Sequence, residues 1–170
     1  MGFPSKAFGG VSSRQRVATS TIVLNVANTT GWKVVYTITG SVLIHAIWAE
    51  VSTVISSNHT KGHLRINDQT AQVDLTESGT GITLSALLVG TMIYKESLLA
   101  VALQLKNNAA GTVEEPASAG QPAFSPFILT KKTAAVTTLD YGYTTTNNPS
   151  TGGLKFKCIW EPLSDDGNVA

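Results

Sequence analysis

The sequence contains a single cysteine, Cys158, among 170 residues. An intramolecular disulfide is therefore excluded, and the fold does not depend on an oxidising compartment. Cys158 alternates with Phe156 and Trp160, and no basic residue accompanies it in a known nucleophile motif. We therefore interpret Cys158 as a small hydrophobic core residue.

Charged residues are also scarce. They make up 14% of the chain, with 12 Lys and Arg against 11 Asp and Glu and a net charge of +1, whereas about a quarter is usual. An uncharged polar surface suits contacts with neighbouring subunits, because little ion desolvation is needed. The small pairs Arg14/Arg16 and Lys131/Lys132 make no basic footprint, so we expect no nucleic-acid partner.

Long uninterrupted hydrophobic runs are missing as well. The longest apolar stretch, residues 84–105, is broken by Gly90 and by the adjacent charges Lys95 and Glu96. Two charges at the centre of a bilayer would cost several kcal/mol. We therefore expect two buried elements here and no membrane contact. Residues 1–10 also lack the apolar core of a signal peptide.

Motifs that carry catalysis or hold cofactors are not found. The sequence has no G-x-S-x-G, no G-x-x-x-x-G-K and no G-x-G-x-x-G. Glu114 and Glu115 are adjacent, so their carboxylates would point apart in a regular strand and not flank one bond. The segment "SDDGN" lacks the alternating acidic ligands of a calcium loop. We predict that the protein is not an enzyme and has no catalytic, metal or cofactor site.

Histidine is a common metal ligand, so the three histidines have to be considered as candidates for a metal site. His59 and His63 in "HTKGH" have the spacing of zinc-binding helices, but Gly62 favours a loop, and no third ligand lies nearby. We expect residues 56–63 to form a loop with exposed histidines. His45 lies within an apolar segment and is expected to be a hydrogen-bonded core or interface residue.

The sequence instead shows an alternation of apolar and polar residues with a period of two, which is the pattern of half-buried strands. It is strengthened by many β-branched residues and by turn residues between the runs. Residues 98–106 also have a helical alternative, because Leu and Ala favour helices. The predicted strands are residues 18–26, 32–39, 42–55, 64–67, 70–77, two elements within 82–105, 127–130, 133–143 and 154–161.

Two of these segments give specific face assignments. In residues 42–55, Val42, Ile44, Ala46 and Trp48 are predicted to share one face of a central strand. In residues 155–162, the side chains of Phe156, Cys158 and Trp160 share a face, and Pro162 ends the strand because it cannot donate to a ladder. We expect the following tail, "DDGN", to lie outside the sheet.

The pattern predicts an all-β fold, a β-sandwich or jelly roll, in one domain of residues 18–170. Residues 1–17 lack any period and are predicted to form an extended N-terminal arm. This arm is either a frayed terminus or a segment that docks on a neighbouring subunit. Its candidate partner-binding residues are Phe3, Phe8, Arg14 and Arg16. Residues 107–126 form the longest irregular stretch.

The aromatic residues leave a second functional hypothesis open, a receptor-binding or carbohydrate-binding head. Exposed rings in a row could stack on sugars, whereas apolar neighbours favour core packing for Trp48 and Trp160. The residues concerned are Trp32, Trp48, Trp160, Tyr36, Tyr94, Tyr141 and Tyr143.

Two stretches, "YTITGSVLIHAIWAEVSTVI" (36–55) and "GGLKFKCIWEPLSDDGNV" (152–169), resemble small virion structural proteins of tailed bacteriophages. That group has a T-x-T-G-x-V strand leading into an E-V-x-T segment, and a closing strand followed by Pro-Leu and Asp-Gly. The residues that fit are Thr37, Thr39, Gly40, Val42, Ile44, Ala49, Glu50, Val51, Thr53, Trp160, Pro162, Leu163, Asp166 and Gly167.

The resemblance implies a β-sandwich that decorates and cements a capsid on the virion surface. The implied partners are the major capsid protein and further copies of the chain, in a closed homo-oligomer. The resemblance implies a trimer around a local symmetry axis. A subunit that binds only the assembled shell stabilises it, by about 2.7 kcal/mol per site at a hundredfold excess over its dissociation constant. A tail-associated location is the alternative.

Overall fold

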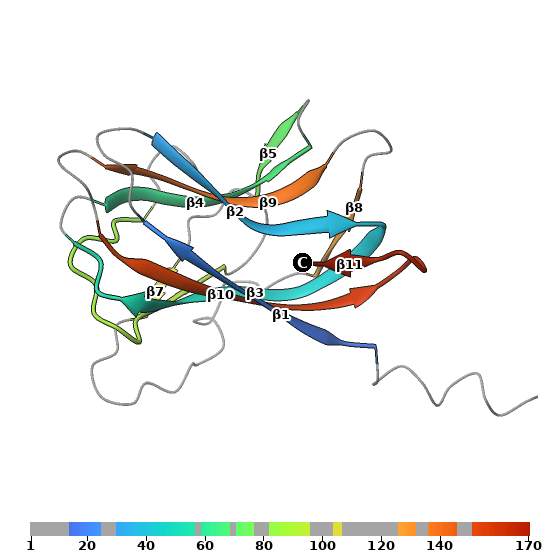
Figure 1. Cartoon of the computed structure of the whole chain (residues 1–170), viewed down its shortest axis with the longest axis horizontal. Coiled ribbons are helices and arrows are strands. Elements are labelled where there is room, and N and C mark those ends of the chain that lie inside the picture. The colour runs from blue at the N-terminus through green and yellow to red at the C-terminus, as the bar shows by residue number, and fades with distance from the viewer. Residues whose placement is uncertain are drawn as a thin grey trace, which may run out of the picture.

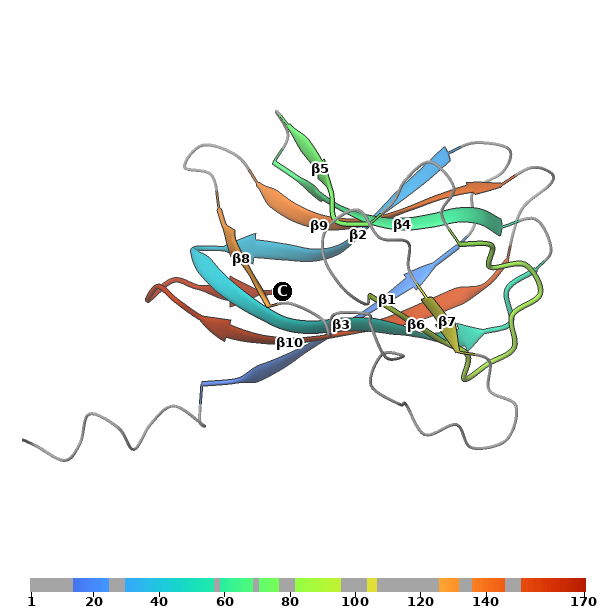
Figure 2. The ribbon, with the colours of Figure 1, turned by 180° about the vertical axis from the view of Figure 1, so that it is seen from behind.

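The chain folds into two antiparallel β-sheets that lie face to face as the layers of a sandwich (Figure 1). The computed structural model describes residues 14–24, 30–56, 59–68, 71–76, 82–95, 104–106, 126–131, 136–145 and 151–170. Within these ranges there is no helix. The all-β prediction is confirmed, and the arrangement is sandwich-like (Figure 2).

The first sheet, here called sheet A, is built around the longest strand, β3 (Ser41–Thr53). The strands follow in the order β1 (Arg16–Val23), β10 (Gly153–Pro162), β3, β6 (Met92–Tyr94) and β7 (Gln104–Lys106), and β8 (Phe127–Thr130) also pairs with β3. The predicted central position of β3 is confirmed, because β10 pairs with one edge of it and β6 and β8 pair with the other.

The second sheet, sheet B, covers one face of sheet A. Its order is β11 (Asn168–Val169), β2 (Thr30–Thr39), β9 (Thr137–Thr145), β4 (His59–Asn67) and β5 (Gln72–Asp74). In both sheets most neighbouring strands come from distant parts of the sequence. Each predicted strand overlaps a described strand. Residues 25–26, 70, 77, 96–103 and 133–135 of the predicted segments lie outside the described residues.

The core lies between the sheets and is rich in aromatic rings. Tyr141 of β9 packs against Phe156 of β10, with ring centroids 5.4 Å apart. The Tyr36 hydroxyl of sheet B donates a hydrogen bond to the carbonyl oxygen of Ala18 in sheet A, at 3.1 Å. Phe156, Cys158 and Trp160 are all buried, so the predicted inward face of the closing strand is confirmed.

The predicted faces of residues 42–55 hold only for the first part of β3. Val42 and Ile44 are buried, but beyond His45 the buried residues are Ile47, Ala49 and Val51. Trp160 pairs with Ile44 while its neighbour Ile159 pairs with Ala46, so His45 is an extra residue in the ladder. Such a β-bulge changes the phase of the alternation. The assignment of Ala46 and Trp48 to the face of Ile44 was therefore wrong.

The predicted loop at residues 56–63 is also wrong from His59 onward, because β4 begins there. The pairing with β9 shifts register between Thr60 and His63, and Lys61 has a φ of 58°. A side chain at Gly62 would collide with the Tyr141 hydroxyl, 2.4 Å from the position of its Cβ. Residues 60–62, whose sequence resembles that of a turn, thus form a bulge-like irregularity inside β4.

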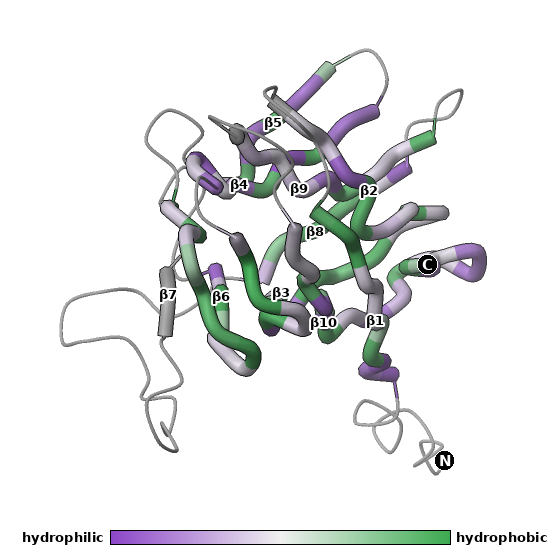
Figure 3. The backbone as a smooth tube through the Cα atoms, turned by 60° about the vertical axis from the view of Figure 1, so that its left-hand side comes forward, coloured by the Kyte–Doolittle hydropathy of each residue, from purple (hydrophilic) through white to green (hydrophobic). Residues whose placement is uncertain are grey.

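The prediction that the tail after β10 lies outside the sheet is wrong. The chain turns back after Ser164, a turn visible as the hydrophilic loop beside the C-terminus in Figure 3, and Asn168–Val169 then forms β11 against β2. The Thr37 amide donates to the Ala170 carbonyl at 2.6 Å, and the Ala170 amide donates back at 3.0 Å. Val169 is buried, so this segment belongs to the fold.

The predicted arm lies largely outside the described residues. Phe3 and Phe8 fall within residues 1–13, and of the irregular stretch 107–126 only Pro126 is described. Arg14 is described and exposed, and Arg16 already belongs to β1. The strand therefore starts two residues before the predicted boundary at residue 18.

Candidate partner-binding groove

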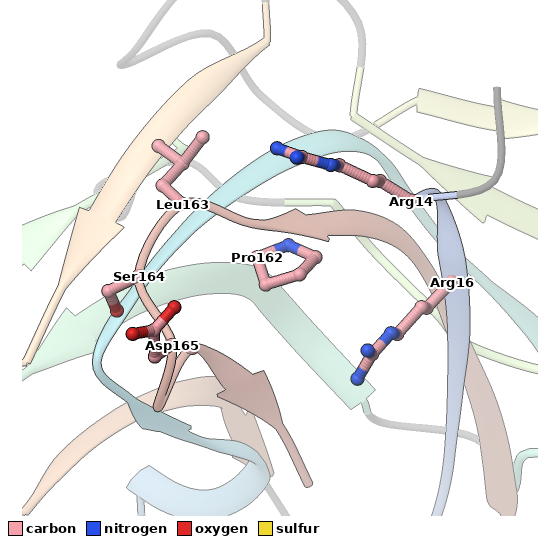
Figure 4. Close-up of a pocket in the computed structure, with 7 residues that line it drawn as sticks. Arg14, Arg16, Pro162, Leu163, Ser164 and Asp165 are labelled. Carbon is pink, nitrogen blue, oxygen red and sulfur yellow. The ribbon is translucent and has the colours of Figure 1, made fainter. Parts of the chain in front are cut away.

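A groove opens at one end of the sandwich, where β1 begins and the chain turns after β10 (Figure 4). Its volume is about 360 Å³. Arg14 and Arg16 line one side, and Pro162–Asp165 with Gly167 line the other. The groove therefore brings the two predicted arginines next to the segment that carries the resemblance.

The turn that forms one wall is held against the start of β3. The Ser41 amide donates to the Ser164 hydroxyl oxygen at 2.8 Å, and the Thr39 hydroxyl donates to the Asp166 carbonyl oxygen at 2.9 Å. Gly40 has a φ of 56°, and a Cβ there would lie 2.4 Å from an Asp166 carboxylate oxygen. Only glycine suits this left-handed, crowded position. Gly40 and Asp166, both residues of the resemblance, therefore lock two distant segments together.

The two arginines give the groove its charge. The Arg16 guanidinium lies 5.3 Å from the centroid of the Trp160 ring, a cation–π contact that orients it. Neither Arg14 nor Arg16 forms an ion pair with a carboxylate of the described residues, although Asp165 lines the same groove. Two unpaired guanidinium groups can bind a carboxylate or phosphate through paired hydrogen bonds.

The groove also has an apolar wall. Pro162 ends β10, and Leu163 after it is 47% exposed. A chain segment that combines an acidic and an apolar side chain would match both walls. The sequence did not point to Asp165 or Ser164 as groove residues, because only the fold brings the turn beside β1.

His59 and His63 are not exposed, which overturns that expectation. Pairing of β4 with β9 places both among aromatic rings. His59 is fully buried and stacks on Tyr143, with centroids 4.4 Å apart, and burial lowers its pKa to about 4. His63 is buried edge-on to Trp32 at 4.8 Å, and its Nδ1 lies 2.6 Å from the Lys61 carbonyl oxygen. The described residues contain no cluster of three or more metal-binding side chains.

Two other single-residue predictions concern His45 and Cys158. The predicted hydrogen bonding of His45 is confirmed, because its Nε2 lies 3.3 Å from a Glu161 carboxylate oxygen, but the side chain is only partly buried and does not belong to the core. Cys158 is fully buried, and burial raises the pKa of its thiol to about 12. A thiol with that pKa stays protonated at neutral pH and packs as a small hydrophobic side chain.

A buried polar cluster on the outward face of sheet B escaped the sequence analysis. Arg65 of β4 and Asp140 of β9 form an ion pair at 3.3 Å. Asp140 also accepts hydrogen bonds from Thr138 at 2.6 Å and from Asn67 at 3.2 Å. The Trp32 ring covers the guanidinium, 3.2 Å from its centroid. Each residue alternates with core residues in its own strand, so only the cross-strand register shows that they meet.

The aromatic residues do not form an exposed row. Tyr36, Tyr141, Tyr143 and Trp160 are buried in the core, which confirms the packing interpretation for these four. The partly buried Trp32 lies in sheet B, whereas Trp48 pairs with Tyr94 in sheet A. The partly exposed rings are therefore divided between two sheets.

Comparison of the chain with protein-family models, with curated proteins and with solved structures gives no match. Among the described residues no helix could cross a membrane.

Proposed function

We propose that this protein is a virion structural protein that decorates and stabilises a bacteriophage capsid through subunit contacts. The observation that carries the proposal is the groove, which is lined by the exposed Leu163 and by Arg14 and Arg16, neither of which forms an ion pair with a described carboxylate. Residues 1–13 join the sandwich directly at this groove. An arm with Phe3 and Phe8 would thus leave the body next to a charged docking site.

The proposal includes finer features. The resemblance implies a trimer and the major capsid protein as partner, and the sequence pattern predicts a jelly-roll-like strand arrangement and an extended arm. A rigid sandwich suits this role, because little conformational entropy is lost when a preorganised surface binds. Shell stabilisation then follows from mass action, since the subunit binds the assembled lattice and not its dissociated parts.

The test is binding of the full chain to purified empty phage heads. We expect removal of residues 1–13, which leaves β1 intact, to weaken binding at least tenfold. Arg14→Glu should weaken it to a similar extent and reduce its dependence on salt, because an exposed charge contact is screened by ions. Lys155→Glu, an equal charge change on an exposed residue of β10 far from the groove, is the matched control.

Unchanged affinity after both changes would remove the arm and the groove from the proposal. A receptor-binding or carbohydrate-binding head is the competing function. The burial of four of the seven aromatic residues gives it little support. Specific binding on a glycan array together with no binding to heads would favour it over decoration.

A further inference from the structure

No described element lies over the outward face of sheet A (Figures 1 and 2). The side chains on this face include an apolar strip. Strand pairing places Val17 of β1 beside Ile159 of β10, and Ile159 beside Ala46 of β3. Leu43 and Ile128 continue the strip where β3 meets β8. Val17 is 66% and Ile128 63% exposed, and the other three are partly buried.

Charges flank this strip in an arrangement of opposite sign. On the outward face of β10, Lys157 lies two residues before Ile159 and Glu161 two residues after it. Each is therefore about 7 Å from Ile159 along the strand. Lys157 is 3.9 Å from Glu50, and Glu161 is 3.3 Å from His45. A positive side chain thus lies on one side of Ile159, and a negative side chain lies at the same distance on the other side.

We propose that this face binds a second copy of the chain, face to face about a two-fold axis. The axis would lie in the interface, pass Ile159 and run at right angles to β10. A two-fold contact uses the same surface on both copies, so the surface must be complementary to itself. Rotation about this axis brings Ile159 against Ile159 and Lys157 against the partner's Glu161, twice in each dimer.

The remaining side chains match under the same rotation. Lys157 pairs across the sheet with Trp48, and Trp48 with Tyr94. Glu161 pairs with Leu43, and Leu43 with Ile128. Trp48 would therefore lie over the partner's Leu43, and Tyr94 over the partner's Ile128. Aromatic rings against aliphatic side chains bury apolar area without unpaired charge.

The size of the patch sets the expected strength. Four strands at the usual spacing, over about five residues each, give a footprint of roughly 20 Å by 20 Å. This is about 400 Å² on each copy, or about 800 Å² in total, which is smaller than the standard specific interface, so the dimer should be weak and should form only in the micromolar range or above. The contact uses neither the groove nor the trimer of the proposed function, and either can fail without the other.

The experiment is sedimentation equilibrium of the full chain over a range of concentrations, with circular dichroism to verify folding. We expect the mass of the unmodified chain to double as its concentration rises, from a monomer to a dimer, or from a trimer to a hexamer where the trimer of the proposed function also forms. Lys157→Glu and Glu161→Lys alone should each raise the dissociation constant about tenfold, because each places like charges together twice. The double variant should restore dimerisation, because the charge pattern is then reversed but still inverts about Ile159.

Lys155→Glu is the control, since it lies on the same strand and face and pairs directly with Glu50, but would have no partner across the interface. It should dimerise as the unmodified chain does. A chain that stays monomeric at all concentrations would overturn the inference. A double variant as weak as the single ones, a control that weakens equally, or a dimer insensitive to all four variants would overturn it as well.

Discussion

His59 is a polar, titratable side chain in an apolar environment. It is fully buried, and neither ring nitrogen has a hydrogen-bond partner among the described residues. A neutral imidazole can be tolerated there because it stacks on the Tyr143 ring. A charged imidazolium would lose its hydration with nothing to replace it. Burial accordingly lowers the pKa of His59 from 6.5 to about 4.

This shift predicts an acid-sensitive fold. Between pH 6.5 and 4 the unfolded chain binds a proton at His59 and the folded chain does not, so stability falls as pH falls through this window. The loss from this group is at most about 1.4 kcal/mol for each pH unit. His59→Phe keeps the ring and removes the titration. Urea unfolding at pH 7, 6 and 5 should show a smaller decrease for the variant, and equal slopes would contradict the assignment.

Sequence patterns predicted single residues well where one strand decides their environment. Phe156, Cys158 and Trp160 alternate within one regular strand, so their burial follows from spacing alone. The environments of His59 and His63 were predicted wrongly because Gly62 favours a loop. The rings that bury the histidines, Tyr143 and Trp32, come from other strands of sheet B. No local pattern contains that information.

At the scale of elements, the segment from β10 to β11 joins the two sheets. β10 lies between β1 and β3 in sheet A, and β11 pairs with β2 in sheet B. The turn between them is fixed by Gly40 and by the hydrogen bond from Ser41 to Ser164. The segment after β10 is short and acidic, and its sequence therefore suggested an unstructured tail. The partner strand β2 lies more than a hundred residues earlier, and this explains why the sequence did not predict β11.

The pairing of β11 predicts a measurable contribution to stability. Val169 is buried beside Ile38, its partner in β2. Val169→Ala removes two methyl groups and leaves a small cavity, so we expect a loss of about 1.5–2.5 kcal/mol in the free energy of unfolding. Asn168→Ala, at the exposed neighbouring position, is the control and should change stability by less than about 0.5 kcal/mol. Equal effects of the two changes in chemical denaturation would show that β11 does not pack as described.

The molecule as a whole is assembled from strands that are distant in sequence. Arg16 pairs with Trp160, Thr39 with Asn168 and Thr30 with Thr144. The fold class was predictable because alternation and turn residues recur along the chain. The strand order was not, because alternation is the same whichever strands become neighbours. Closing such long loops costs entropy before any contact is gained, so folding should be slow, in the range of milliseconds to seconds.

The same topology predicts that the sandwich folds as one cooperative unit. β10 is the only described strand that pairs with β1, and its residues Phe156 and Trp160 fill the core. A chain that ends at Gly152 would lack both β10 and β11, leave β1 and one edge of β3 unpaired, and expose Tyr36 and Tyr141. We expect it to show no cooperative unfolding transition in calorimetry and to lack the near-ultraviolet circular dichroism of packed aromatic rings. A chain that begins at Arg14 keeps every described strand and should retain both signals. A native-like transition in the fragment without β10 and β11 would contradict this prediction, because the remaining strands would then be stable on their own.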